Sequence, residues 1–176
     1  MDFARVLDTM AALFEREGVR FAVIGAFGLH AYGLTRATLD LGLVTEAAAQ
    51  PAVVAFLESL GYETLYRSAG YSNHVHAMPA LGRVDVMYVG AETSRILFGG
   101  CGTLALPSGR QVPVPRPEHL VAMKVQAMKN NPRRTLRDLA DIQDLLELSG
   151  IDVGEVRGYF ERAGLLERFD ELRRPS

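Results

Sequence analysis

The sequence predicts a mixed α/β domain followed by an all-helical region, and two observations carry this prediction. Residues 1–115 alternate short apolar runs of strand type with amphipathic helical segments, which is typical of a mixed sheet flanked by helices. Residues 116–176 show helical periodicity only, beginning where Pro115 and Pro117 interrupt the strand pattern. We therefore expect an α/β core over residues 1–115 and a helical C-terminal region, residues 116–176, packed on it.

The composition indicates a soluble globular protein. The chain has 176 residues, of which 48% are hydrophobic, and a formal net charge of -2 at pH 7. This balance does not indicate a protein that coats nucleic acid by bulk positive charge, and it leaves a local basic patch open. No run approaches the ~20 apolar residues of a membrane span, and the acid-containing N-terminal segment is unlike a signal peptide. We expect a cytoplasmic protein that does not contact a membrane.

The elements of the N-terminal part follow from periodicity and from glycine and proline punctuation. Apolar residues recur at three- and four-residue spacing from Phe3 to Phe14, which predicts a helix that ends at Gly18. His74 and His76 alternate on a strand without further metal ligands nearby, so we interpret them as strand-surface histidines. The same signals predict helices over residues 50–61 and 92–98, strands over residues 62–66, 103–106 and 111–114, and two strands around a turn at residues 79–82.

The stretch from residue 23 to residue 44 organises the rest of the chain. A buried-strand run leads into a small-residue turn at Gly25 and Ala26. The chain then returns through a polar segment to a second apolar run, which Asp40 opens. Because an unpaired buried carboxylate is costly, Asp40 is either a cap or turn aspartate or a metal ligand that faces a cleft.

A second acidic residue of interest, Asp85, lies on a later strand. It stands between Val84 and Val86 in a run apolar enough for a central strand, and the period of two directs it to the face opposite both valines. Two alternatives stay open: Asp85 pairs with a base such as Arg83 or Arg36, or it holds a metal ion. The single cysteine, Cys101, excludes an internal disulfide, and we interpret it as a small strand residue rather than a nucleophile.

The C-terminal region is predicted to be a set of helices. Pro117 opens the first of them, which carries Lys124 on or beside its apolar stripe. A lysine there either extends its stem along the core or reaches a phosphate. Asp152 is expected to cap a later helix, and Gly164 separates that helix from the last one.

The second C-terminal helix combines an apolar stripe with three acidic residues. Thr135 is expected to cap it. Asp138, Asp141 and Asp144 follow one another at three-residue spacing, so they share one line along the helix, and we interpret them as a solvated charged face. The expected buried stripe consists of Leu136, Leu139, Ile142, Leu145 and Leu146.

These motifs occur in an order that resembles a known family. Gly25-Ala26, a spacer, and then Asp40-Leu41-Gly42-Leu43 look like the nucleotidyltransferase superfamily signature of a glycine bend followed by an acidic strand. More narrowly, the segment with Tyr32-Gly33, Arg36 and Thr38 resembles AbiEii-type nucleotidyltransferases of bacterial toxin–antitoxin and phage-defence systems. The segments PRPEHLVAMKVQAM and RDLADIQDLL are similar to two helices of that family, so the resemblance covers residues 20 to 147.

The resemblance implies a fold and a reaction. The fold would be a nucleotidyltransferase-like α+β arrangement, with a mixed central sheet flanked by helices. The reaction would be metal-dependent transfer of a nucleoside monophosphate from an NTP to an acceptor, which could be RNA, a protein or a small molecule. A cognate antitoxin would be a possible partner chain.

The resemblance also implies roles for individual residues. Asp40 and Asp85 would hold Mg²⁺ or Mn²⁺ on the triphosphate. The backbone at Gly25 and Ala26 would donate hydrogen bonds to phosphate oxygens. The remaining roles concern charge and orientation: Arg36 and Lys124 would neutralise phosphate charge, Thr38 would bind a phosphate or support the turn, and Asp138 and Asp141 would orient Lys124 or assist the nucleophile.

One residue departs from the family pattern. The second acid of the strand motif is Gly42, which has no side chain to bind a cation. Because residues 40 and 42 face the same way on a strand, an oxygen ligand is missing there, and Glu46 or water is a conceivable substitute. Three hypotheses result: a transferase with a weakened site, a non-catalytic binding or regulatory module of the same fold, and an unrelated α/β domain whose acids are structural. Gly42 favours the second hypothesis, and the buried charges of both signs favour the first.

Overall fold

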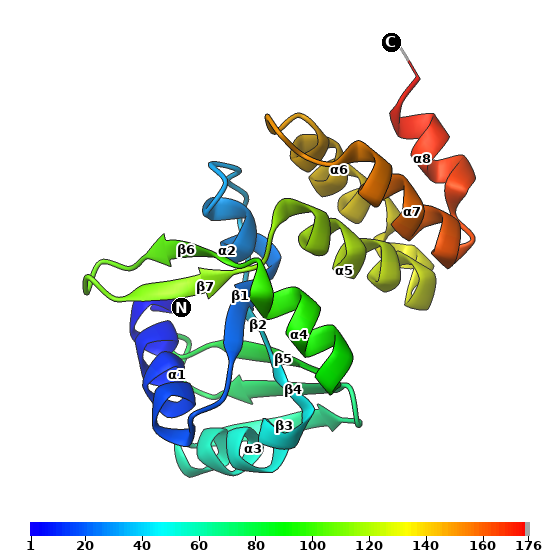
Figure 1. Ribbon diagram of the computed structural model, residues 1–176. Coiled ribbons are helices and arrows are strands. Elements are labelled where there is room, and N and C mark those ends of the chain that lie inside the picture. Colours follow the sequence, from blue (N-terminus) through cyan, green and yellow to red (C-terminus); the bar gives the residue numbers. More distant parts are fainter. Residues whose placement is uncertain (175–176) are drawn as a thin grey trace. The chain divides into compact units, whose positions relative to one another are not determined.

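The chain divides into two compact units, Met1–Pro115 and Arg116–Ser176. The computed structural model describes residues 1–174 (Figure 1). The N-terminal unit is mixed α/β and the C-terminal unit is helical. Packing of the helical region on the α/β core stays a prediction.

The N-terminal unit is built on a five-stranded mixed sheet with the strand order β1-β2-β5-β4-β3. β2 and β5 run parallel, and the other neighbouring strands are antiparallel. β6 and β7 form a separate two-stranded sheet. The predicted fold class, a mixed sheet with flanking helices, is confirmed. The strands are β1 (Phe21–Ile24), β2 (Asp40–Glu46), β3 (Tyr62–Arg67), β4 (Tyr71–His76), β5 (Arg83–Val89), β6 (Gly102–Ala105) and β7 (Gln111–Val114).

The helices of this unit begin and end at the residues that the sequence marks. The first helix is capped by Asp2, whose carboxylate accepts a hydrogen bond from the backbone N–H of Arg5, and it ends at Gly18 with φ 65°. Pro51 lies in the first turn of the third helix. The helices are α1 (Phe3–Glu17), α2 (Gly25–His30), α3 (Gln50–Ser59), α4 (Ala91–Gly99) and the short 3₁₀ helix Ala47–Ala49.

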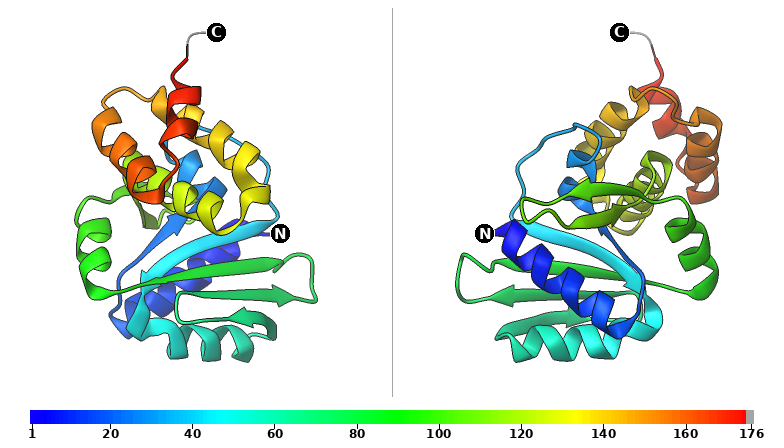
Figure 2. Two further views of the ribbon diagram at one scale, coloured as in Figure 1. Left: turned by 90° about the vertical axis from the view of Figure 1, so that its right-hand side faces the viewer. Right: turned by 60° about the vertical axis from the view of Figure 1, so that its left-hand side comes forward.

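The core lies on one face of the five-stranded sheet, where α1 and α3 cover it (Figure 2). Leu41 and Leu43 of β2, and Val84 and Val86 of β5, belong to the same buried cluster as the apolar residues of α1. Because side chains alternate along a strand, the intervening residues of β2 and β5 point to the opposite face. That face is half-exposed near the starts of both strands.

His74 is buried, so the prediction of a strand-surface histidine was wrong for this residue. It pairs with Val84 across the sheet and therefore lies on the core face, where it is 0% exposed. Its Nε2 lies 2.8 Å from Ser72 Oγ and its Nδ1 lies 3.1 Å from Thr64 Oγ1. The hydroxyls of Ser72 and Tyr88 are 2.7 Å apart, so the imidazole belongs to a buried polar network.

The folded protein is expected to lose stability in mild acid because of this histidine. Burial lowers the pKa of His74 from 6.5, since the charged imidazole loses its hydration, and this outweighs the attraction of Glu58 and Asp85. Below pH 6.5 the unfolded chain therefore binds more protons than the folded chain. The free energy of unfolding consequently decreases as the pH is lowered. Urea denaturation at pH 7.5 and 5.5 should show a smaller pH dependence for His74→Gln than for the wild type. Equal pH dependence in the two proteins would contradict this explanation.

Over its described residues, 116–174, the C-terminal unit consists of four helices and a short 3₁₀ turn. As predicted, Asp152 caps a helix by accepting a hydrogen bond from the backbone N–H of Glu155, and Gly164 ends that helix with φ 73°. Phe160 and Phe169 pack together in the interior of this unit, with ring centroids 5.5 Å apart. The elements are α5 (Pro117–Asn130), the 3₁₀ turn Pro132–Arg134, α6 (Thr135–Leu146), α7 (Val153–Ala163) and α8 (Leu166–Leu172).

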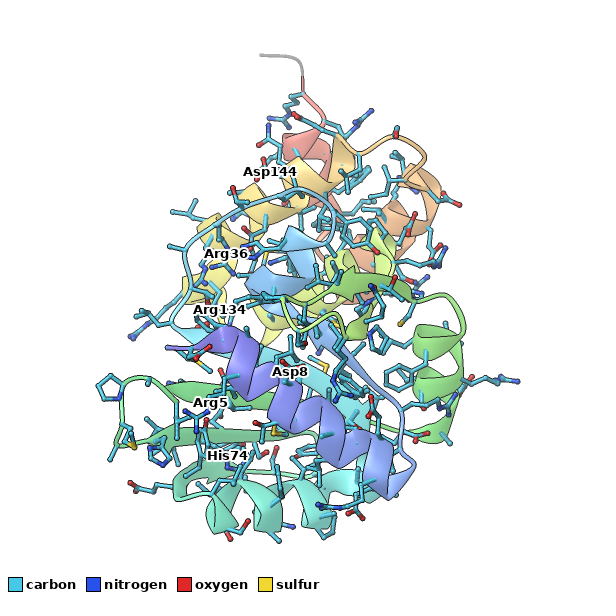
Figure 3. All side chains as sticks on the ribbon, turned by 90° about the vertical axis from the view of Figure 1, so that its left-hand side faces the viewer. Arg5, Asp8, Arg36, His74, Arg134 and Asp144 are labelled. Atoms are coloured by element: carbon cyan, nitrogen blue, oxygen red, sulfur yellow. The ribbon has the colours of Figure 1, made fainter. Side chains whose placement is uncertain are left out.

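The second helix of this unit differs from the prediction in its buried face. Leu136 is 86% exposed, whereas Asp138 and Asp141 are 0% and 5% exposed. Thr135 lies inside the helix rather than at its N-cap, which is Arg134. Of the three acids, only Asp144 lies on the exposed face (Figure 3). The buried residues 138, 141, 142 and 145 follow helical spacing, so the acids and the apolar residues share one face.

Candidate active site

The glycine bend lies directly beside the start of β2. β1 ends at Ile24, which pairs with Gly42 of β2, and Gly25 then turns the chain into α2 with φ 67°. This left-handed conformation costs little for glycine and roughly 1–2 kcal/mol for other residues. The bend at Gly25 and Ala26 therefore directly follows Ile24, the residue that pairs with Gly42.

Asp40 and Asp85 are brought to the same face of the sheet. In the parallel pairing of β2 with β5, Asp40 is level with Arg83, and Gly42 is level with Asp85. Residues that pair across strands point to the same side, so the two aspartates lie on neighbouring strands, two residues apart in register. The prediction that these carboxylates meet across adjacent strands is consistent with this register, although their binding of a metal stays a prediction.

Asp85 is paired with a base, which is one of the two alternatives that the sequence left open. Its Oδ1 accepts a hydrogen bond from Nε of Arg83 at 2.9 Å and another from Nδ2 of Asn73 at 2.8 Å. Asn73 is the residue opposite Asp85 on β4. The Asp85 side chain is 19% exposed, so a carboxylate in partly desolvated surroundings is compensated by a cation and an amide.

Asp40 is oriented from within its own loop. The hydroxyl of Thr38 donates to Oδ1 of Asp40 and lies 3.3 Å from the Asp40 carbonyl oxygen. In this structure Thr38 thus supports the start of β2. Arg36 lies in the same loop, where its Nη1 donates to the carbonyl of Ala37 at 3.3 Å (Figure 3).

Glu46 does not replace the acid that is missing at residue 42. It lies at the far end of β2, and four residues of strand separate the two positions by about 13 Å. Its carboxylate forms an ion pair with Arg20 at 2.7 Å and accepts a hydrogen bond from Ser94 at 3.0 Å. The hydrogen bonds from Arg20 lower the pKa of Glu46 despite its partial burial. Glu46 is therefore part of a separate ion pair.

The backbone of β1 approaches Gly42 closely. A Cβ atom at residue 42 would lie 3.2 Å from Cγ1 and 3.3 Å from the carbonyl oxygen of Ile24. Most Cβ contacts in proteins are longer than this, so an acid at residue 42 would require β1 to move by a few tenths of an ångström. Glycine therefore suits this position sterically, in addition to removing a possible ligand.

Lys124 lies in a buried ionic cluster of the helical unit. Its Nζ contacts Oδ2 of Asp141 and lies 3.8 Å from Oδ1 of Asp138. Arg134 donates to the other carboxylate oxygen of Asp138 at 3.2 Å. Both acids thus lie against the ammonium group of the lysine. Their role in orienting Lys124, and a contact of Lys124 with phosphate, stay predictions.

The donor set at the sheet fits a weakly held divalent cation. Within residues 1–174 there is no group of three or more His, Cys, Asp or Glu residues that could hold a metal ion. Asp40 and Asp85 are two hard oxygen donors, and Mg²⁺ commonly retains several waters beside one or two carboxylates. The residues that sequence reasoning missed are Asn73 and, as a member of the site, Arg83. Their placement depends on strand register, which the local pattern does not contain.

The chain has the fold of known nucleotidyltransferases. A structure of ANT(2'')-Ia in complex with adenylyl-2''-tobramycin matches with a TM-score of 0.66 at 14% identity, over 94% of this chain and 98% of that chain. A nucleotidyltransferase-like protein from Paracoccidioides brasiliensis matches with a TM-score of 0.63 at 15% identity, over 97% and 90%. The lincosamide antibiotic adenylyltransferase LnuA, bound to lincomycin, matches with a TM-score of 0.55 at 18% identity, over 82% and 97%.

The likeness to these proteins is one of fold. No protein-family profile matches this sequence, and no curated protein matches it. The nucleotidyltransferase-like architecture expected from the motifs is confirmed by the structural matches alone. No helix in the described part of the chain, residues 1–174, has the length and apolar character that a membrane span requires.

Proposed function

We propose that this protein binds a nucleoside triphosphate on the half-exposed face of its sheet and transfers the nucleoside monophosphate to an acceptor hydroxyl. The observation that carries the proposal is the position of Asp40 and Asp85 on one face of β2 and β5, beside the Gly25 bend, in a nucleotidyltransferase fold. In this reaction the acceptor oxygen bonds to the α-phosphorus, pyrophosphate leaves, and the hydroxyl proton passes to water.

The site residues would have two kinds of role, cation binding and phosphate contact. Asp40 and Asp85 would hold Mg²⁺ or Mn²⁺, which neutralises charge on the triphosphate when bound. The Gly25 bend, with Ala26, would allow the backbone to approach a phosphate. Further phosphate contacts would come from Arg36 and Thr38 of the α/β unit. In the helical unit, Asp141 would orient Lys124, to which the resemblance gives the same role.

The acceptor class is supported by what the matched proteins are known to bind. ANT(2'')-Ia is seen with adenylyl-2''-tobramycin, and LnuA is an adenylyltransferase seen with lincomycin. These likenesses favour a small hydroxylated molecule over RNA or protein as the acceptor. The AbiEii-type resemblance supports a different setting, a toxin or phage-defence protein with a cognate antitoxin.

A specific observation favours a second candidate function, a non-catalytic module that binds nucleotide. Gly42 stands where the family has an acid, and Asp85 is already paired with Arg83. Residues 40, 42, 83 and 85 together carry two negative charges and one positive charge, so a divalent cation would meet a formal charge of -1. Such a site would hold metal weakly and could bind nucleotide without transferring it.

Incubation of the full chain with each α-³²P-labelled NTP, Mg²⁺ or Mn²⁺, and tobramycin, lincomycin or total RNA tests the first candidate. We expect a slow, metal-dependent label on an acceptor, lost in Asp40→Asn because the amide cannot balance the cation's charge. If the wild type transfers no label and Gly42→Asp does, the non-catalytic candidate is established. Gly42→Ala is the matched control, because it introduces the same steric contact with Ile24 without the carboxylate.

A further inference from the structure

We propose that Arg83 is a phosphate-binding residue of this site and that Asp85 serves to position it. This inference rests on the nucleotide binding proposed above. Arg83 opens β5, is level with Asp40, and points to the same face of the sheet as Asp40 and Gly42. An arginine thus lies in register with the acids that the fold would use for a cation.

The contacts of Arg83 leave its terminal nitrogens available. The guanidinium donates through Nε to Oδ1 of Asp85 at 2.9 Å, and its side chain is 46% exposed. Among the hydrogen bonds of residues 1–174, the one that Arg83 donates from its guanidinium uses Nε and leaves Nη1 and Nη2 unused. The two terminal NH2 groups belong to a half-exposed side chain and form a planar fork, which matches the geometry of phosphate oxygens.

Asp85 is arranged to fix that fork. Its Oδ1 receives both Arg83 and Asn73, and Asn73 is held opposite it by the pairing of β4 with β5. A rigid carboxylate anchors Nε and restricts the rotamers of the arginine, so less entropy is lost when a phosphate binds. Charge supports the same role, because one of the two acids of the site is already neutralised by Arg83.

Gly42 explains why an arginine can take this position. An acid at residue 42 would stand level with Asp85 on the neighbouring strand and would bring a third carboxylate to the face that Arg83 occupies. Three carboxylates favour a divalent cation, whereas two carboxylates and one guanidinium favour direct contact of the protein with phosphate. We therefore expect nucleotide binding that persists without a metal ion.

Calorimetric titration of the full chain with each of the four ribonucleoside triphosphates, once with Mg²⁺ and once with EDTA, tests the proposal. The wild type should bind in EDTA. Arg83→Gln should weaken binding in EDTA by about tenfold or more, since a charge-assisted hydrogen bond is lost. Arg83→Lys should lie between the two, because it keeps the charge and loses the fork.

Variants of Asp85 separate positioning from metal binding. Asp85→Asn keeps an oxygen that accepts the Nε–H, so we expect binding in EDTA within about threefold of the wild type, whereas Asp85→Ala should weaken it by about tenfold. Arg95→Gln, an exposed arginine on α4, is the control for the same change of charge, and thermal melting checks that each variant is folded.

The possible failures are distinguishable. Equal affinity of Arg83→Gln and wild type in EDTA would overturn the role of Arg83 and leave the proposed function standing. If the wild type binds nucleotide only with Mg²⁺, the role of Arg83 would also be overturned and the proposed function would stand, because the metal ion would then contact the phosphates. No binding of any nucleotide by the wild type, with or without Mg²⁺, would overturn both.

Discussion

Replacement of Lys124 by methionine is expected to lower the free energy of unfolding of the helical unit by about 3–5 kcal/mol. Methionine is similar in length and tolerates the apolar surroundings of α5, so the loss comes from charge rather than from packing. The Lys124 side chain is 9% exposed and its Nζ contacts Asp141. Without the ammonium group, Asp141 and the fully buried Asp138 keep their negative charges while losing a cation that compensates them.

Urea denaturation at neutral pH measures this effect, with Lys129→Met as the matched control. Lys129 lies in the last turn of the same helix and is exposed, so its replacement should change stability by no more than about 0.5 kcal/mol. The double variant Lys124→Met with Asp141→Leu should recover part of the loss, because it removes the uncompensated acid as well. Wild-type stability in Lys124→Met would show that the ion pair contributes nothing.

The boundaries of the elements could be predicted because local residues determine them. Gly18 and Gly164 adopt the left-handed conformation that ends a helix, and Asp152 accepts the hydrogen bond that begins one. Pro117 lies in the first turn of α5, as its fixed φ favours. Each of these signals acts within a few residues of chain, so the sequence alone is sufficient to read it.

The face that a helix buries was harder to predict where charge and apolarity compete. Leu136 matches the periodicity of a core residue and is exposed, whereas Asp138 and Asp141 match a solvated face and are buried. The reason is Lys124 on a different helix, which contacts Asp141 and lies 3.8 Å from Asp138, together with Arg134, which donates to Asp138. Burial of a carboxylate depends on a partner that is distant in sequence, so the pattern of α6 alone could not indicate it.

The candidate site was predictable in its acids and not in their partners. Asp40 and Asp85 stand out because the first opens an apolar run and the second interrupts one. Asn73 is polar on a strand with polar neighbours, and only the register of β4 with β5 places it opposite Asp85. The same holds for Arg83, whose position level with Asp40 follows from a parallel pairing between strands far apart in the chain. Similarly, the close contact of Gly42 with Ile24 depends on β1.

Phe14→Ala is expected to destabilise the N-terminal unit by about 3–5 kcal/mol, because it removes a buried ring and leaves a cavity. Phe14 is 0% exposed on α1, and its ring stacks on that of Phe21 with centroids 4.6 Å apart and an angle of 15° between the ring planes. Phe21 opens β1, the strand that leads to the Gly25 bend. The α1 packing therefore supports the strand that leads into the Gly25 bend.

Chemical denaturation followed by circular dichroism measures the loss, and Phe98→Ala is the control for removing a phenylalanine of this unit. Phe98 on α4 is only partly buried, and the centroid of its ring lies 5.4 Å from Cζ of Arg20, so its removal should cost no more than about 1–2 kcal/mol. Without denaturant, at a temperature where Phe14→Ala is folded, the nucleotide affinity of this variant should stay close to that of the wild type, because no site residue changes. A large loss of affinity in fully folded Phe14→Ala would mean that the bend is set by the core more directly than the strand pairing indicates.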